Sequence, residues 1–167
     1  MTNIFFRLNN SVKISSVNDV IFSDRLICCG GLFSDILAIK TNKNIDIKIV
    51  PFRGDYYELK PSATHLINNL VYPVPDPDLP FLGVHFTRMY DGRVECGPNA
   101  VFSFKREGYN KFDFSLSDSL DSLSYIGTWK LFLSHFMYGI GEYSRAISKN
   151  LFLKSLQELL PNLKNSD

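Results

Sequence analysis

Hydrophobic and polar residues alternate over short distances in the first third of the chain, and this alternation predicts strands. Residues 12–14 alternate, residues 18–19 supply a turn, and residues 20–22 form the next apolar stretch. Residues 25–29 begin with Arg25 and continue as an apolar run up to the pair Gly30-Gly31, which is typical of a buried, parallel strand. The pattern therefore predicts a β-meander followed by one buried strand.

The middle of the chain favours a short helix and then more strands. The pair Ser34-Asp35 is suited to begin a helix, and a strand is expected over residues 46–59. A shorter strand over residues 70–72 leads into a loop with four prolines, which have no backbone N–H to donate. A hairpin is expected over residues 82–96, because Asp91-Gly92 suits a turn with positive φ angles.

Helical periodicity dominates the last third. Ser115 and Asp118 have the spacing of a capping box, and apolar residues then recur in three sets with the spacing of a helix face. The sets are Leu116, Leu120 and Leu123; Trp129, Phe132, Leu133 and Phe136; and Phe152, Leu156, Leu159 and Leu160. Gly139 and Gly141 are expected to interrupt the second run, and Pro161 to end the third. A sheet followed by helices, without regular βα alternation, predicts an α+β domain.

Composition narrows the classes of protein. The 167 residues are enough for a domain with a hydrophobic core, and a formal net charge of +1 gives no electrostatic reason to expect nucleic acid as a partner. Cys28, Cys29 and Cys96 form neither a disulfide framework nor a zinc pattern, so we expect all three to be reduced core residues of a cytosolic protein. The sequence contains no secretory leader pattern and no apolar stretch of the length needed for a membrane span.

Candidate chemistry lies first in the segment from Pro51 to Tyr57. Arg53 beside Gly54 leaves room for a ligand, since an arginine can bind a carboxylate through two hydrogen bonds and tyrosine hydroxyls can bind the same anion. An ion pair between Arg53 and Asp55 within the strand explains the same residues without any ligand. The spacing does not decide between the two interpretations.

A second candidate segment runs from Gly83 to Arg88. Strand alternation predicts that His85 and Thr87 share one face, where His85 could act as a base or hydrogen-bond donor. A structural histidine is the alternative. Gly97-Pro98-Asn99 either ends the hairpin, with Asn99 capping its own turn, or opens the strand end on to a bound ring. No HExxH, GxSxG or P-loop motif is present, which disfavours a hydrolase.

Several blocks of the sequence, in order, resemble the L-2-hydroxyglutarate oxidases and dehydrogenases, FAD-dependent enzymes of the D-amino-acid-oxidase-like group. The blocks are residues 51–57, 72–77, 80–87, 91–92, 97–101, 104–109 and 113–115. The resemblance covers residues 11–167, and a match of several such blocks with the right spacing is highly specific.

The resemblance implies a two-domain flavoenzyme that oxidises L-2-hydroxyglutarate to 2-oxoglutarate by hydride transfer to FAD, with oxygen or a membrane quinone as the electron acceptor. Residues 1–45 would be a remnant of a Rossmann-type FAD-binding domain, and residues 46–167 a mostly antiparallel substrate domain that roofs the flavin and ends in helices.

Site residues follow from the matching blocks. Cys29, Gly30, Gly31 and Leu32 would lie beside the FAD. Substrate binding would fall to Arg53, Tyr56, His85 and Thr87, with His85 as the candidate catalytic base. No metal is implied.

The chain also departs from the family pattern. It lacks the GxGxxG fingerprint of the dinucleotide fold and the family's C-terminal segment, so we expect the polypeptide alone to be inactive and to need flanking segments. The expected location is the cytoplasm, or peripherally the inner face of the membrane. Three alternatives stay open: a domain that stands alone from Met1, a non-catalytic interaction module, and a related flavoenzyme for another small hydroxy or amino acid.

Overall fold

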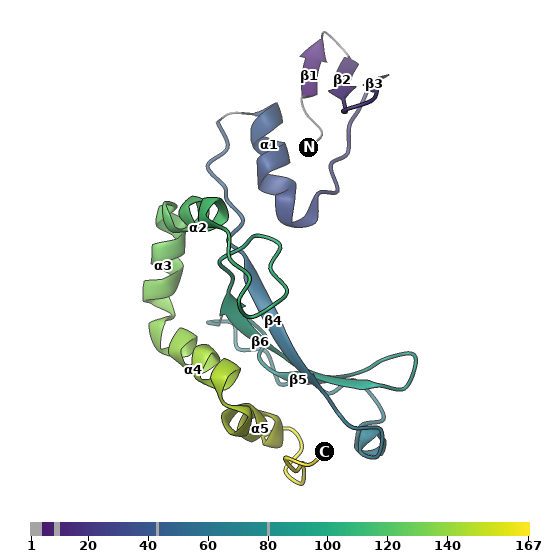
Figure 1. Cartoon of the computed structure of the whole chain (residues 1–167), viewed down its shortest axis with the longest axis vertical. Helices are drawn as coiled ribbons and strands as arrows, with labels where there is room; N and C mark the ends of the chain where they lie inside the picture. The colour runs from purple at the N-terminus through teal and green to yellow at the C-terminus, as the bar shows by residue number, and fades with distance from the viewer. Residues whose placement is uncertain (1–4, 9–10, 43, 80) are drawn as a thin grey trace. The chain divides into compact units, whose positions relative to one another are not determined.

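The computed structural model describes residues 5–8, 11–42, 44–79 and 81–167 (Figure 1). The chain divides into two compact units, residues 1–51 and residues 52–167, and each is described by itself. Both units mix antiparallel strands with helices, so the α+β class is confirmed. Residues 46–51 group with the first unit, whereas the predicted domain boundary lies after residue 45.

The first unit contains the predicted β-meander. Strands β1 (Phe5–Leu8), β2 (Ser11–Ser15) and β3 (Val20–Ser23) pair antiparallel in that order. The Ser16 side chain accepts a 2.8 Å hydrogen bond from the Asp19 amide and closes the turn between β2 and β3. A short 3-10 helix, η1 (Gly31–Phe33), leads into helix α1 (Ser34–Thr41), as expected.

The predicted buried strand at residues 25–29 is wrong. These residues form no strand, and Ile27, Cys28 and Cys29 are exposed. A buried parallel strand needs paired neighbours and helices over both faces, and the described part of this unit supplies neither around residues 25–29. Asp35 carries a structural role instead, since its carboxylate accepts hydrogen bonds from the amides of Ile36 (2.8 Å) and Ile49 (3.0 Å).

The second unit contains a three-stranded antiparallel sheet in the order β4 (Phe52–Glu58), β6 (Val94–Phe102), β5 (His85–Arg88). The predicted hairpin between β5 and β6 is confirmed, with Gly92 at a φ of 89°. Of the strand expected over residues 46–59, the part 52–58 forms. The short strand expected over residues 70–72 is reduced to a single bridge between Val71 and Phe86, beyond a 3-10 turn, η2 (Thr64–Leu66).

Four helices follow the sheet along one side of β4 and β6 (Figure 1). They are α2 (Leu116–Leu123), α3 (Ile126–Ser134), α4 (Phe136–Ile147) and α5 (Lys149–Gln157). Ser115 caps α2 by accepting from the Asp118 amide, which is one half of the predicted capping box; the Ser115 amide donates to the Phe104 carbonyl oxygen instead of to Asp118. Gly139 and Gly141 do not interrupt the helix, contrary to expectation, because the break falls at His135 and both glycines lie within α4.

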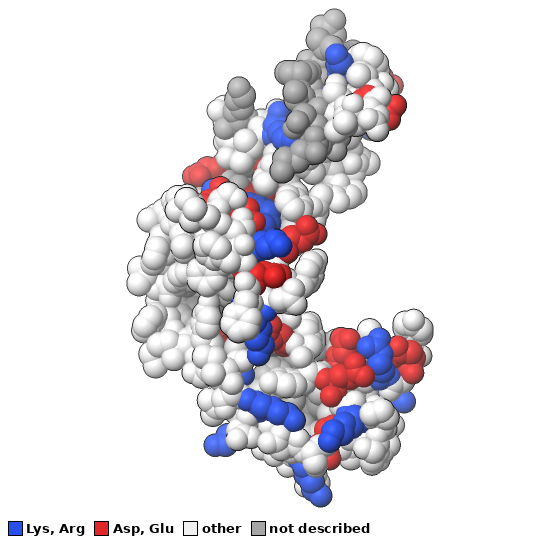
Figure 2. Space-filling model, viewed as in Figure 1, with Lys and Arg blue, Asp and Glu red and all other residues white. Residues whose placement is uncertain are grey.

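The hydrophobic core of this unit lies between the sheet, the segment 59–67 and helix α5. Its buried members are Leu59, Ala63, Ile67, Val84, Phe86, Val94, Cys96, Phe152, Leu156 and Leu163. Cys96 is thus the core residue that was predicted, whereas Cys28 and Cys29 are not. Charged side chains are sparse over α2 and α3 in Figure 2, in contrast to the part of the unit around α5.

Candidate functional site

The sheet of the second unit presents one face to the helices and leaves the other open. Phe86 and Cys96 point to the helix side and are buried, and the ring of Tyr57 packs on Phe152 of α5 at a centroid distance of 4.9 Å. Because side chains alternate along a strand, His85 and Thr87 lie on the opposite face, as predicted. Opposite them on β6 are Gly97, the partner of His85, and Glu95, the partner of Thr87.

The imidazole of His85 is held from two sides. Its ring lies 4.3 Å from the ring of Tyr72, centroid to centroid, with 30° between the planes. Nδ1 lies 3.1 Å from the carbonyl oxygen of Gly83. In the tautomer that carries its proton on Nδ1, this atom donates to Gly83, and Nε2 is then able to accept a proton. The bridge between Val71 and Phe86 places Tyr72 beside His85, through two backbone hydrogen bonds of 2.9 and 3.0 Å.

Tyr56 joins the same open face, where two glycines make space for its ring. Gly97 has a φ of 149°, and a Cβ there would lie 2.8 Å from Cδ1 of Tyr56 and 2.9 Å from the Asp55 carbonyl oxygen. At Gly54 a Cβ would lie 3.1 Å from the Tyr56 ring. Burial first, and then the charge of Glu95 and the neighbouring Tyr72, raise the pKa of Tyr56, so its hydroxyl remains a donor at neutral pH.

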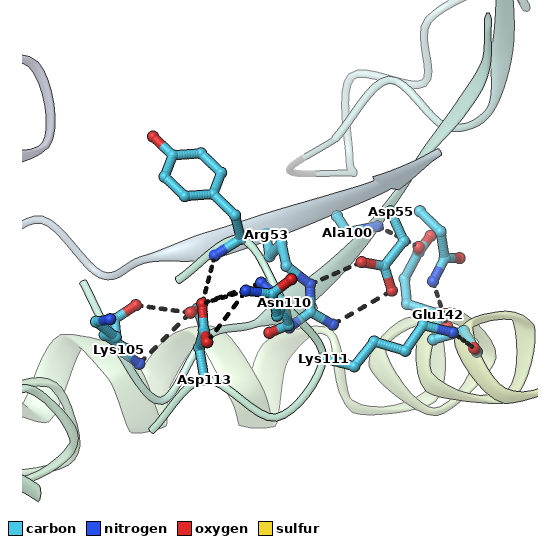
Figure 3. Close-up of polar contacts among 12 residues, drawn as sticks. Arg53, Asp55, Ala100, Lys105, Asn110, Lys111, Asp113 and Glu142 are labelled. Carbon is cyan, nitrogen blue, oxygen red and sulfur yellow. Dashed lines mark hydrogen bonds and ion pairs between the residues drawn. The ribbon is translucent and has the colours of Figure 1, made fainter. Parts of the chain in front are cut away.

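Arg53 is not part of this cluster. It lies on the helix side of β4, where its Nε donates to Asp55 Oδ1 at 2.7 Å and its Nη2 to Asp55 Oδ2 at 3.3 Å (Figure 3). Its Nη1 donates to the carbonyl oxygen of Asn110 at 2.8 Å. The structure therefore contains the ion pair that the sequence offered as the alternative, and it does not bring Arg53 together with Tyr56, His85 and Thr87.

A buried polar network links the sheet to α4. Asn99, which is fully buried, donates from Nδ2 to the carbonyl oxygen of Glu142 at 2.7 Å and accepts from Nε of Arg145 at 3.1 Å. The Glu142 carboxylate accepts from the Ala100 amide at 2.8 Å and pairs with Arg145 (Figure 3). Asn99 thus binds a helix 43 residues away, and it is not the turn cap that the sequence suggested.

Sequence reasoning missed Tyr72 and Glu95 on the open face. Glu95 carried a usable signal, because pairing the predicted hairpin about Asp91-Gly92 sets it opposite Thr87. Tyr72 carried none, since its position depends on a single bridge at the edge of a proline-rich loop.

The predicted cofactor residues belong to the first unit. Gly31 has a φ of 51° in the turn before α1, and a Cβ on Gly30 would lie 2.5 Å from Cδ1 of Leu37, so the Leu37 side chain would have to move for any larger residue at position 30. Cys29 and Leu32 are exposed. Their contact with FAD stays a prediction.

Comparison with known proteins decides the family. The family described as FAD dependent oxidoreductase matches residues 6–165. The chain belongs to this family. It is 46% identical over 160 residues to an L-2-hydroxyglutarate dehydrogenase of Indibacter alkaliphilus, covering 95% of this chain and 40% of that protein. A mitochondrial L-2-hydroxyglutarate dehydrogenase of Nematostella vectensis is 47% identical over 96% of this chain and 35% of its own length.

An Escherichia coli protein with the name L-2-hydroxyglutarate dehydrogenase is 46% identical over 85% of this chain and 34% of its own length. The chain therefore spans about a third to two fifths of the length of the curated relatives that it matches.

The described residues suit FAD only in part. An open sheet face with an imidazole and hydroxyls can pack against a flat ring. A pyrophosphate needs a glycine-rich turn at a helix N-terminus, and the first turn of α1 carries the acidic Asp35 instead.

Among the described helices, none combines the length and apolar character needed to cross a bilayer.

Proposed function

We propose that the second unit forms the substrate-facing wall of an FAD-dependent enzyme that oxidises L-2-hydroxyglutarate to 2-oxoglutarate. The names of relatives at 46–47% identity support the substrate. The observation that carries the proposal is the cluster of Tyr56, Tyr72, His85 and Thr87 on the sheet face that the helices leave open.

When bound, FAD would supply the acceptor for the hydride that leaves C2 of the substrate. Nε2 of His85 takes the proton from the C2 hydroxyl, because Nδ1 is already engaged with the Gly83 carbonyl. Tyr72 holds the imidazole plane by stacking. The hydroxyls of Tyr56 and Thr87 supply hydrogen bonds to substrate oxygens.

The charge of the open face refines this proposal. Glu95 lies beside the cluster, and Arg93 already pairs with Asp91 and Glu58. A dicarboxylate substrate needs cations, and Arg53 would have to leave Asp55 to bind it. We therefore propose that the substrate carboxylates are bound mainly by groups from outside residues 52–167, and that Arg53 has a structural role in this unit.

We also propose that the first unit is a remnant of the Rossmann-type FAD-binding domain and that its residues 29–32 lie beside the cofactor. The partners would be the flanking segments of the family protein and oxygen or a quinone as acceptor. The location would be cytoplasmic or peripheral at the inner face of the membrane. We expect the 167-residue polypeptide alone to bind FAD weakly, because the pyrophosphate turn is absent from its sequence.

A chimera tests the reaction. The 160 aligned residues of the Indibacter alkaliphilus relative are replaced by those of this chain, and turnover is measured with L-2-hydroxyglutarate, its D enantiomer and glycerol 3-phosphate. We expect turnover of the L enantiomer, and a loss of kcat of about 10²–10⁴-fold in His85→Gln. Thr64→Ser, in the 3-10 turn η2 and outside the strands of the sheet, serves as control.

Equal turnover by His85→Gln and the parent chimera would remove His85 as the base. Preference for glycerol 3-phosphate, or a chimera that binds FAD but oxidises none of the three compounds, would overturn the proposed substrate.

A further inference from the structure

Helices α2, α3 and α4 bury polar side chains and expose apolar ones. The buried residues of these three helices are Ser119 and Ser122 in α2, Thr128 in α3 and Glu142 in α4. The large apolar residues at their exposed positions are Leu116, Leu120, Ile126, Trp129, Leu133, Phe136, Met137, Ile140, Tyr143 and Ile147. We call these ten residues the outer apolar face.

Polar bonds fix this orientation. Thr128 Oγ1 donates to the Ser122 carbonyl oxygen at 2.6 Å, and Glu142 binds the Ala100 amide and Arg145. Rotating α4 to bury Met137 (76% exposed) or Ile147 (86% exposed) would leave the Glu142 carboxylate without these partners. The exposure is therefore imposed by the fold and does not reflect a loosely placed helix.

The outer apolar face borders a hollow of about 550 Å³ between the helices and the end of β6. Aromatic rings line it, among them Phe102, Phe104, Trp129 and Phe132. Tyr138 also lines it, with a buried hydroxyl that forms no hydrogen bond of normal geometry within the described residues. Burial first, and then the nearby Glu142 carboxylate, raise the pKa of Tyr138 to about 12. An occupant would have to fill a concave apolar space whose wall carries the Tyr138 hydroxyl beside Glu142.

We propose that the outer apolar face and its hollow bind further polypeptide of the family protein, from the portion of its length that lies outside residues 6–165 as matched here. The relatives carry 60–65% of their length beyond the matched region, which is ample chain to cover it. Protein side chains can fill a hollow, and backbone or side-chain oxygens can accept from Tyr138. The proposal rests on family membership and is independent of the substrate.

Two other occupants fit less well. Residues 116–147 contain three acidic and two basic residues, so this face lacks the excess of Lys and Arg that draws an apolar helix face to an anionic membrane. A symmetric contact with a second copy would set hollow against hollow and fill neither.

The proposal is tested by introducing the same double substitution into two proteins and comparing its effects. Leu133→Glu/Met137→Glu is introduced into the 167-residue chain and into the chimera with the Indibacter alkaliphilus relative. Lys154→Glu on the exposed side of α5 is the control, since it also changes the net charge by −2. Thermal unfolding, sedimentation velocity, and co-sedimentation with vesicles of phosphatidylcholine and phosphatidylglycerol (3:1) are measured.

We expect the double variant to lower the midpoint of the chimera by more than about 5 °C while leaving that of the 167-residue chain within about 2 °C, because the two side chains are exposed in the chain alone. Lys154→Glu should leave both proteins unchanged. If the glutamate chimera does not fold, Leu133→Gln/Met137→Gln should give a smaller loss in the same context.

Three results would overturn the proposal. Equal, small effects in both contexts would mean that the face stays in water in the intact protein. A dimer of the 167-residue chain that the double variant dissociates would assign the face to a second copy. Binding of the chimera to vesicles, lost in the double variant, would assign it to lipid. None of these readouts depends on turnover, so a failure here is distinct from a failure of the proposed reaction.

Discussion

Helix α5 and the three helices before it belong to the same unit, but they bury opposite kinds of side chain. In α5, Phe152 and Leu156 are buried and Lys154 faces water. In α2 to α4 the buried positions hold serine, threonine and glutamate, while leucine, phenylalanine and methionine are exposed. The sequences of α2, α4 and α5 are all clearly amphipathic, yet they bury opposite kinds of residue, so periodicity alone does not say which face a protein buries.

The difference shows where each part of the unit obtains its stability. Around α5, the segment 59–67 and the sheet enclose a conventional apolar core. Around α4, directional hydrogen bonds through Asn99 and Glu142 hold the helix. A region that relies on polar bonds while its apolar side stays open is what an interface looks like before its partner is present.

The largest expected effect separates the two regions directly. Phe152→Ala should lower the free energy of unfolding by about 3–5 kcal/mol, because it empties a buried site in the core. Phe136→Ala, the same substitution at an exposed position in α4, should cost less than about 1 kcal/mol. Urea denaturation of the 167-residue chain measures both. Equal losses would mean that the outer apolar face is already buried in the chain alone.

A smaller effect is expected from the polar region. Glu142→Gln should lower the free energy of unfolding by about 2–3 kcal/mol, since it weakens the bond to the Ala100 amide and leaves Arg145 without its carboxylate. A double-mutant cycle with Arg145→Met isolates the pair, and denaturant unfolding of all four proteins provides the data. Additive losses would show that the pair contributes nothing beyond its separate contacts.

A third substitution tests the hydrogen bond that connects the end of α2 to the start of α3. Thr128→Val keeps the shape of a fully buried side chain but removes the donor to the Ser122 carbonyl oxygen. We expect a loss of about 1–2 kcal/mol in the free energy of unfolding. Thr64→Val, at a half-buried turn position whose hydroxyl donates to the Pro61 carbonyl oxygen, is the control and should change stability less. A neutral Thr128→Val would mean that apolar packing, and not hydrogen bonding, fixes this connection.

Local signals in the sequence predicted the elements well. The Asp-Gly turn, the Ser115 cap and the final helix all depend on neighbouring residues and are present in the structure. The strand at residues 25–29 failed because an apolar run becomes a strand only beside a partner strand, which no local pattern supplies. The prediction of the helices is limited for the same reason. The spacing of Leu116 and Leu120 identifies one face of a helix, but it does not identify what packs against that face.

In the candidate site, too, local features were predictable from the sequence and contacts between distant segments were not. His85 and Thr87 share a face because alternation within one strand is local. Tyr72 and the Arg53–Asn110 contact join segments distant in sequence, and a single chain offers no signal for such pairs. The Arg53–Asp55 pair lies between these cases: both residues are neighbours in the sequence, but the sequence did not show that they pair on the helix side of the sheet.

The smallest expected effect is a change in the pH dependence of the free energy of unfolding, which tests the hydrophobic core beneath α5. Burial raises the pKa of the Cys96 thiol from 9.0 to about 12 in the folded chain. Below about pH 9 both folded and unfolded chains carry the neutral thiol, and its contribution is fully present. Between about pH 9 and pH 12 only the unfolded chain ionises, so stability falls. The free energy of unfolding should thus drop by about 1 kcal/mol more in the parent chain than in Cys96→Ala between pH 8 and about pH 10. Parallel urea titrations at the two pH values measure this, and exposed Cys28→Ala serves as the matched control. An identical pH dependence in parent and Cys96→Ala would show that the core beneath α5 admits water.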